Sequence, residues 1–243
     1  MDSNKLINPH DKFFREALGR KDMALGFVEE YLPPEIRKVL DLKSLEIVKD
    51  SYIDKELSEH FSDILYRINI DGKQSFVYLL FEHKSYLDRL VPFQLLRNMV
   101  KIWEQFLKQN RRAKKLPIIV PLIIYHGQKK WRLRNDFSSL FEKVGGTDEY
   151  IPDFRSELFD ISHTSDERIK GALQTRAFLL LLKHILDPRL LESHPEIMGF
   201  VVELTKDKRA MEYLEVFIRH VVSTVERSKS KDLKRAILKT LGN

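Results

Sequence analysis

Residues 61–84 read FSDILYRINIDGKQSFVYLLFEHK. Two runs rich in β-branched and aromatic residues, 61–70 and 74–84, flank the pair Asp71-Gly72. An Asp-Gly pair between two apolar runs is a strong hairpin signal, because both central residues of such a turn adopt a positive φ. The stretch therefore predicts two antiparallel strands joined by a two-residue turn.

The register of this hairpin makes Asp63 a diagonal neighbour of Glu82. Because side chains alternate across a sheet, Asp63, Glu82 and Lys84 project from one face. The ring of His83 points away, so only its backbone carbonyl could reach a metal there. Two carboxylates and a lysine suit phosphodiester hydrolysis assisted by Mg²⁺. Spacing alone fits equally well a solvated strand end, with Asp63 as a turn or cap residue.

The elements around the hairpin predict an α/β fold. They are a helix over 11–32, a short strand over 45–48, the two hairpin strands, a helix over 90–109 and a strand over 118–124. Pro33-Pro34 ends the first helix. The last strand is apolar throughout, as expected for a strand covered on both faces, although Pro121 indicates a sheet edge or a bulge. We expect a four-stranded mixed sheet flanked by helices, with the last strand parallel to the second hairpin strand.

The pattern changes beyond residue 136. A loop with Gly145-Gly146 and Pro152 leads to segments of helical periodicity near 166–187, 196–205, 208–226 and 230–241. We expect a core over residues 1–135 and an all-helical C-terminal region over 136–243, packed on the core or following it. These C-terminal helices are also the expected site of a homodimer contact.

The composition narrows the class of protein. The chain has 243 residues, of which 43% are hydrophobic, enough for a sizeable core. It has no cysteine, which excludes a disulfide framework and a thiolate zinc site. The N-terminus has no apolar segment of the signal-peptide type, and no apolar run approaches the ~20 residues of a membrane span. We therefore expect a cytoplasmic protein.

Basic residues cluster in the segment 105–135, which has no acidic residue. Its candidates for contact with a nucleic-acid backbone are Lys108, Arg111, Arg112, Lys114, Lys115, Lys129, Lys130 and Arg132. A second basic segment spans 227–239. Clustered lysine and arginine neutralise phosphates well, although a solvated helix end and loop would look the same. We expect DNA as the partner, and we expect the two halves of the first segment to flank one end of the sheet.

Five short motifs carry a resemblance to a known family. They are PHDKFF at 9–14, YLP at 31–33, SDIL at 62–65, LFEHKS at 80–85 and IYHG at 124–127. With the order of elements, they resemble the Rpn family of recombination-promoting nucleases, also called YhgA-like putative transposases, within the PD-(D/E)xK superfamily. The resemblance is continuous from about residue 8 to 135 and looser beyond.

This resemblance implies a restriction-endonuclease-like core and a bacterial DNA endonuclease associated with recombination. It also implies a divalent metal, Mg²⁺ or another such as Mn²⁺, held by Asp63 and Glu82. Asp11 and Glu16 are accessory candidates, because an acidic residue of the first helix sometimes joins this site in the superfamily. Related nucleases often have Gln-x-x-x-Tyr after the active-site strands, where this chain has Asn98 four residues after Gln94.

Two further polar residues are candidates, and two other functions are open. Gln94 could contact DNA or the attacking water, or lie on the helix rim. His126 could contact phosphate or order the turn with Gly127. One rival function is a catalytically degenerate module that binds DNA or protein. The other is a transposase of the ribonuclease-H type, whose chemistry needs three carboxylates and has no use for Lys84.

Overall fold

The computed structural model describes residues 9–48, 63–82, 87–142 and 144–184, together with Ile197, Gly199 and Glu203. The chain divides into two compact units: residues 1–30 with 164–243 form the first, and residues 31–163 form the second. In the part of the chain that the structure describes, no helix combines the length and apolarity needed to cross a bilayer.

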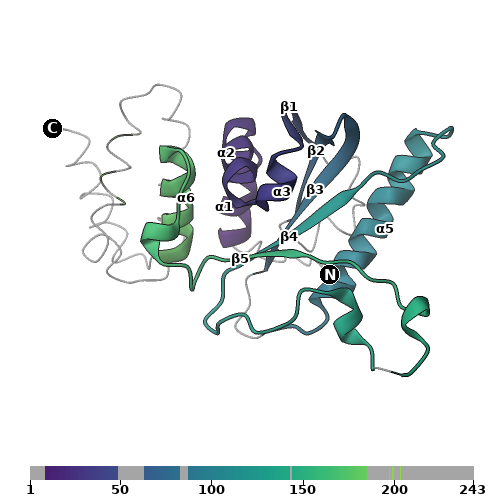
Figure 1. Cartoon of the computed structure of the whole chain (residues 1–243). Coiled ribbons are helices and arrows are strands. Elements are labelled where there is room, and N and C mark those ends of the chain that lie inside the picture. The colour runs from purple at the N-terminus through teal and green to yellow at the C-terminus, as the bar shows by residue number, and fades with distance from the viewer. Residues whose placement is uncertain are drawn as a thin grey trace, which may run out of the picture. The chain divides into compact units, whose positions relative to one another are not determined.

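The second unit contains a five-stranded mixed sheet in the order β1-β2-β3-β4-β5 (Figure 1). The strands are β1 (Leu40–Ile47), β2 (Ile64–Ile70), β3 (Lys73–Glu82), β4 (Ile119–Tyr125) and β5 (Glu157–Asp160). Strand β2 is antiparallel to both of its neighbours, β1 and β3, whereas β3, β4 and β5 run parallel. The α/β class and the parallel β3–β4 pair are confirmed. The expected count of four strands is wrong, because β5 is a short, half-buried strand with no alternation of polarity.

The β2–β3 hairpin has the predicted register. Ile70 pairs with Lys73, and this pairing continues without a shift along β2. Asp71 and Gly72 have φ values of 49° and 69°, so both occupy the left-handed region that a two-residue turn requires. A Cβ at Gly72 would meet nothing within 4 Å, so the backbone conformation rather than crowding favours glycine there.

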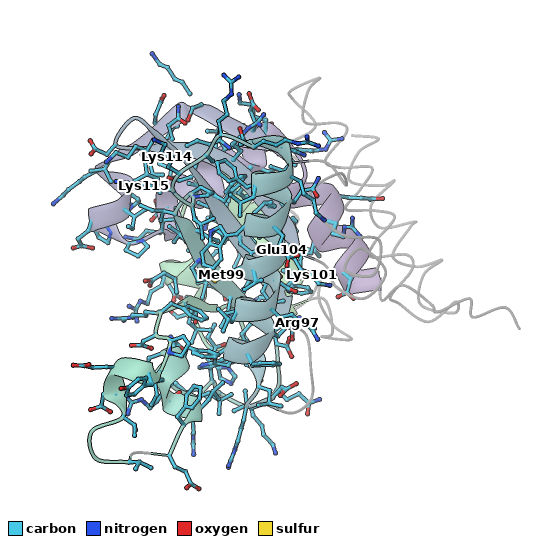
Figure 2. All side chains as sticks on the ribbon, turned by 90° about the vertical axis from the view of Figure 1, so that its right-hand side faces the viewer. Arg97, Met99, Lys101, Glu104, Lys114 and Lys115 are labelled. Atoms are coloured by element: carbon cyan, nitrogen blue, oxygen red, sulfur yellow. The ribbon has the colours of Figure 1, made fainter. Side chains whose placement is uncertain are left out.

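Helix α5 (Val91–Gln109) connects β3 to β4 and packs on one face of the sheet (Figure 1). Its side chains share a hydrophobic core with β2, β3 and β4; among them are Leu95, Met99, Ile102 and Phe106. In Figure 2, Met99 lies on the side of α5 that faces the sheet, whereas Arg97 and Glu104 lie on its outer side. The helix expected over 90–109 is therefore confirmed.

Strand β4 is entirely buried and is an inner strand of the sheet, not the edge that Pro121 indicated. The carbonyl of Ile118 accepts the N–H of Phe76, and the N–H of His126 donates to the carbonyl of Glu82. The backbone N–H and C=O groups of the even-numbered residues in segment 118–126 therefore point toward β3. Pro121 faces the other side, where pairing with β5 begins only at Leu122. The proline consequently removes no hydrogen bond from the β3–β4 ladder.

Two helices replace the single helix expected over 11–32: α1 (Pro9–Leu18) and α2 (Lys21–Tyr31). The break falls at Gly19, whose N–H donates to the carbonyl of Arg15 at 2.9 Å. A Cβ at Gly19 would lie 2.5 Å from that oxygen, so the backbone at the end of α1 leaves no room for a side chain there. The apolar spacing runs on across this break, which is why it predicts one helix. A short helix, α3 (Pro34–Arg37), then begins at the second proline of the expected stop.

Helix α6 (Leu173–His184) packs with α1 and α2 inside the first unit. The rings of Phe13 and Phe178 lie 5.0 Å apart. A Cβ at Gly26 would lie 2.7 Å from Oγ1 of Thr175, so the close approach of α2 and α6 depends on glycine. The remaining short elements are the 3₁₀ turns η1 (Phe137–Leu140), η2 (Asp148–Tyr150) and η3 (Asp166–Arg168).

The expected C-terminal region is only partly covered by the described residues. Of the helix expected over 166–187, α6 forms the central part. Ile197, Gly199 and Glu203 are helical, whereas the segments 208–226 and 230–241 lie outside the described residues. Strand β5 shows that the chain beyond residue 136 is not all helical. The division into 1–135 and 136–243 and the homodimer contact stay predictions.

Candidate active site

Two carboxylates are buried at the same end of the sheet. Asp63 precedes β2 directly and Glu82 is the last residue of β3, so the antiparallel pairing brings them to one end. Their exposed fractions are 4% and 3%. Because side chains alternate along a strand, Asp63 projects from the same face of the sheet as Leu65, and Glu82 from the same face as Leu80. Both leucines belong to the hydrophobic core under α5. Both carboxylates therefore belong to the face that α5 covers.

Asp63 is held by a tyrosine and an asparagine. The hydroxyl of Tyr78 on β3 donates to Oδ2 of Asp63. Nδ2 of Asn98 on α5 donates to the Tyr78 hydroxyl at 2.6 Å and to Oδ2 of Asp63 at 3.3 Å. Burial raises the pKa of Tyr78 well above its ordinary value, and the charge of Asp63 raises that pKa further. The Tyr78 hydroxyl therefore keeps its proton and acts as a donor.

Gln94 lies one helical turn before Asn98 on α5, and both are buried. Among the described residues, Nε2 of Gln94 and Oδ1 of Asn98 have no hydrogen-bond partner. A buried polar atom without a partner is rare in proteins and asks for a functional explanation. The same face of α5 thus presents an amide donor and an amide acceptor. The role of Gln94 toward DNA or water stays a prediction.

The end of β4 adjoins Glu82. Tyr125 is the register partner of Glu82, and the N–H of His126 donates to the Glu82 carbonyl at 3.0 Å. Burial raises the pKa of Tyr125, and the charges of Asp160 and Glu82 raise it further. The predicted accessory residue His126 is therefore brought beside Glu82 through its backbone, and it is itself buried.

Asp63 and Glu82 supply the hard oxygen donors that Mg²⁺ and Mn²⁺ prefer. Within the described ranges, no group of three or more His, Cys, Asp and Glu residues could hold a metal. Mg²⁺ commonly binds one or two protein carboxylates and completes its shell with water and substrate phosphates. The pair therefore fits a cation shared with a phosphate-bearing substrate better than one enclosed by protein ligands.

Several predicted site residues cannot be placed in this cluster. Lys84 and His83 lie outside the described residues, so their proposed roles stay predictions. Asp11 and Glu16 lie on α1, which belongs to the first compact unit, whereas the carboxylate pair belongs to the second. Their accessory role stays a prediction as well.

The basic residues of segment 105–135 form two exposed groups at opposite ends of β4. A far-end group precedes the strand and consists of Arg111, Arg112, Lys114 and Lys115, with Lys108 in the last turn of α5. A site-end group follows the strand and consists of Lys129, Lys130 and Arg132. Figure 2 shows Lys114 and Lys115 toward one end of α5 and Arg97 toward the other. The expectation that both halves flank one end of the sheet is wrong, because an extended strand separates them.

The loop that carries the site-end group is anchored at several points. The hydroxyl of Tyr125 donates to the carbonyl of Lys129 at 2.8 Å. The N–H of Trp131 donates to Oδ2 of Asp160 at 3.1 Å, and its indole packs edge-on against the Tyr125 ring. Because β3 and β4 are parallel, this anchored loop lies at the end of the sheet that carries Glu82.

Tyr78 and Asn98 are the functional candidates that the sequence analysis missed. Asn98 entered it only as a departure from a related motif, and Tyr78 only as a strand residue. The hairpin register could have indicated Tyr78. Because Tyr78 pairs with Leu65, Tyr78 is a diagonal neighbour of Asp63, on the side away from Glu82. No pattern in the sequence pairs Tyr78 with Asn98, because that contact joins a strand to a helix.

Comparison with known proteins places the chain in a family. Residues 8–212 match the family described as "Putative transposase, YhgA-like". The chain belongs to this family. It is 28% identical over 185 residues to "Recombination-promoting nuclease RpnC" of Escherichia coli (strain K12), covering 73% of this chain and 58% of that protein. It is 28% identical over 201 residues to "Recombination-promoting nuclease RpnD" of Escherichia coli O157:H7, covering 81% and 72% respectively.

Other relatives of this YhgA-like chain carry contrasting names. One is "Recombination-promoting nuclease RpnA" of Escherichia coli (strain K12), 32% identical over 127 residues, with 52% of this chain and 43% of the relative covered. Another, from the same strain, is "Inactive recombination-promoting nuclease-like protein RpnE", 26% identical over 198 residues, 79% of this chain and 63% of the relative. The chain thus spans less than two thirds of RpnC, RpnA and RpnE. No solved structure matches the chain.

Proposed function

We propose that the chain is a divalent-metal-dependent DNA endonuclease of the PD-(D/E)xK type that acts in DNA recombination with weak sequence specificity. The observation that carries this proposal is the buried pair Asp63 and Glu82 at one end of the β2–β3 hairpin. Burial of two carboxylates at one site is unfavourable unless they bind a cation or other partners. Relatives that are named recombination-promoting nucleases support the same reading.

In this proposal, Asp63 and Glu82 hold Mg²⁺ or Mn²⁺, with the carbonyl of His83 as a further oxygen donor. The cation, when bound, polarises the scissile phosphate and lowers the pKa of a bound water. Lys84, two residues after Glu82, positions that water or neutralises the charge that develops on the phosphoryl oxygens. Gln94 offers a buried amide donor from α5 to the water or to DNA.

The DNA backbone is gripped by exposed lysine and arginine side chains. The site-end group Lys129, Lys130 and Arg132 is the leading candidate, because its loop is anchored at the end that carries Glu82. Contacts to phosphates carry no direct base information, which is why we expect weak sequence specificity. The far-end group lies at the opposite end of β4 and is therefore a weaker candidate for contact with the same phosphates.

A catalytically degenerate module that binds DNA or a protein is the second candidate function. The specific observation in its favour is the similarity to RpnE, which is named inactive. Against it, this chain retains Asp63, Glu82 and Lys84 together. The two functions differ in whether the parent chain cuts DNA when Mg²⁺ or Mn²⁺ is present.

A plasmid-nicking assay with Mg²⁺, with Mn²⁺ and with a chelator tests the proposal. We expect nicking by the parent only with metal, and none by Asp63→Asn or Glu82→Gln. Lys84→Ala should lower the rate by about 10²–10³, the range for loss of one electrostatic stabiliser. The matched control is Asp71→Asn, which removes an exposed carboxylate at the other end of the same hairpin and should cut as the parent does. Thermal melting checks that each variant folds.

Two outcomes would decide against this assignment. Equal nicking by the parent and by the Asp63 and Glu82 variants would mean that the site is wrong. DNA binding without nicking by the folded parent, under either metal, would favour the degenerate module.

A further inference from the structure

Two elements of the second unit, β3 and α5, converge on one oxygen of Asp63. The Tyr78 hydroxyl from β3 and Nδ2 of Asn98 from α5 both donate to Oδ2, while Asp63 itself stands at the entry to β2. All three residues are buried. The two donors therefore fix the Asp63 carboxylate from two directions.

The hydrogen bonds of this cluster run in one direction. The amide nitrogen of Asn98 can only donate, so the Tyr78 oxygen accepts from it at 2.6 Å. The single hydroxyl proton of Tyr78 is then directed to Oδ2 of Asp63, which accepts it. Each bond in such a chain polarises and strengthens the next.

A carboxylate that binds a cation through one oxygen usually has its other oxygen hydrogen-bonded by neighbouring groups. Those neighbours fix the orientation of the ligand, and their loss typically weakens metal affinity or activity about 10–100-fold. We infer that Tyr78 and Asn98 are positioning residues, whose hydrogen bonds to Oδ2 fix the orientation in which Asp63 meets the metal. This inference rests on the proposed function, because it assumes that Asp63 binds a divalent cation.

The simpler account is that these bonds only satisfy polar groups that happen to be buried. That account predicts a loss of folding stability when the hydroxyl is removed, with no change in metal binding. The positioning role predicts a loss of metal affinity whether or not the stability changes. Metal binding by the DNA-free protein therefore separates the two accounts.

The test is Tyr78→Phe, which removes the hydroxyl and keeps the ring, and its matched control is Tyr66→Phe. Tyr66 is also fully buried, on β2, and its position in the strand places it on the face opposite Asp63. Isothermal titration with Mn²⁺ should show about 10–100-fold weaker binding in Tyr78→Phe and parental binding in Tyr66→Phe. In the nicking assay, raising Mn²⁺ should restore the rate of Tyr78→Phe, with KM for DNA unchanged.

A second variant protects the test against misfolding. Asn98→Leu removes the amide of α5 at similar volume and leaves the Tyr78 hydroxyl, so we expect a smaller loss of Mn²⁺ affinity. Parental Mn²⁺ affinity in both variants would overturn the inference and leave the proposed function standing. Absence of Mn²⁺ binding by the folded parent would instead overturn the proposed function and this inference with it.

Discussion

The two ends of strand β3 handle their polar residues in opposite ways. One end carries Glu82, and there the side chains of Asp63 and Asn98 are buried as well. The Tyr78 hydroxyl links Asp63 to Asn98 by hydrogen bonds. At the other end, Asp71 and the far-end group of basic residues are exposed to solvent. The same strand therefore carries an enclosed polar cluster at one end and a solvated turn at the other.

This contrast shows which charges are informative. An exposed charge stays hydrated at little cost, so its presence says little about function. A buried carboxylate loses its hydration and persists only where partners or a cation replace it. The end of β3 with the buried carboxylates therefore marks the candidate active site. The other end can influence DNA binding only through its exposed charges, and stability only through the geometry of its turn.

The largest effect is expected from the site-end group. Reversal of all three charges, Lys129→Glu, Lys130→Glu and Arg132→Glu, should weaken DNA binding. The slope of log affinity against log salt concentration should also become shallower by about 2 to 3 units, because each phosphate contact contributes about 0.9 to that slope. Fluorescence anisotropy of labelled duplex in a salt series, with chelator to prevent cutting, measures this slope. An unchanged slope would show that these residues are only a solvated loop.

An intermediate effect, on stability alone, is expected at the turn. Gly72→Ala places a side chain at φ 69° in open space, which should lower the free energy of unfolding by about 1–2 kcal/mol. Urea unfolding measures the change, and Mn²⁺ affinity should stay parental. Gly145→Ala is the control, because a Cβ there also meets open space without a positive φ. Loss of Mn²⁺ binding in folded Gly72→Ala would show that the two ends of β3 are coupled.

The smallest effect is expected from the far-end group. Reversal of Arg111, Arg112, Lys114 and Lys115 to Glu should change the same salt slope by less than about one unit, since few of these residues should contact the phosphates bound near Glu82. The anisotropy series used for the site-end variant gives a direct comparison. A fall as large as that of the site-end variant would mean that bound DNA extends along β4 to both loops.

The sequence predicts best what neighbouring residues determine. The pair Asp71-Gly72 requires a specific turn, and that turn fixes the register of the whole hairpin and hence the common end of Asp63 and Glu82. The long amphipathic pattern of α5 is predicted for the same reason. Short-range chemistry is sufficient for both features.

What the sequence does not predict depends on contacts between distant segments. Strand β5 has four residues without alternation, and it is a strand only because β4 lies beside it. The contact of Tyr78 with Asn98 needs the position of α5 on the sheet, which periodicity does not give. The two basic groups look adjacent in the sequence because the strand between them has only seven residues, yet an extended strand separates its ends.

The position of Pro121 and the form of the two edge strands also affect how readily the sheet could pair edge to edge with a second sheet. A sheet edge with a long row of unpaired N–H and C=O groups invites strand-to-strand aggregation. On one side, β1 has an irregular register between Asp41 and Glu46 and exposes both charges. On the other, β5 is short, and Pro121, which has no N–H, lies on β4 just before the residue that pairs with the start of β5. Among the described residues, neither edge of the sheet therefore offers a long, regular row of backbone groups for pairing with a second sheet.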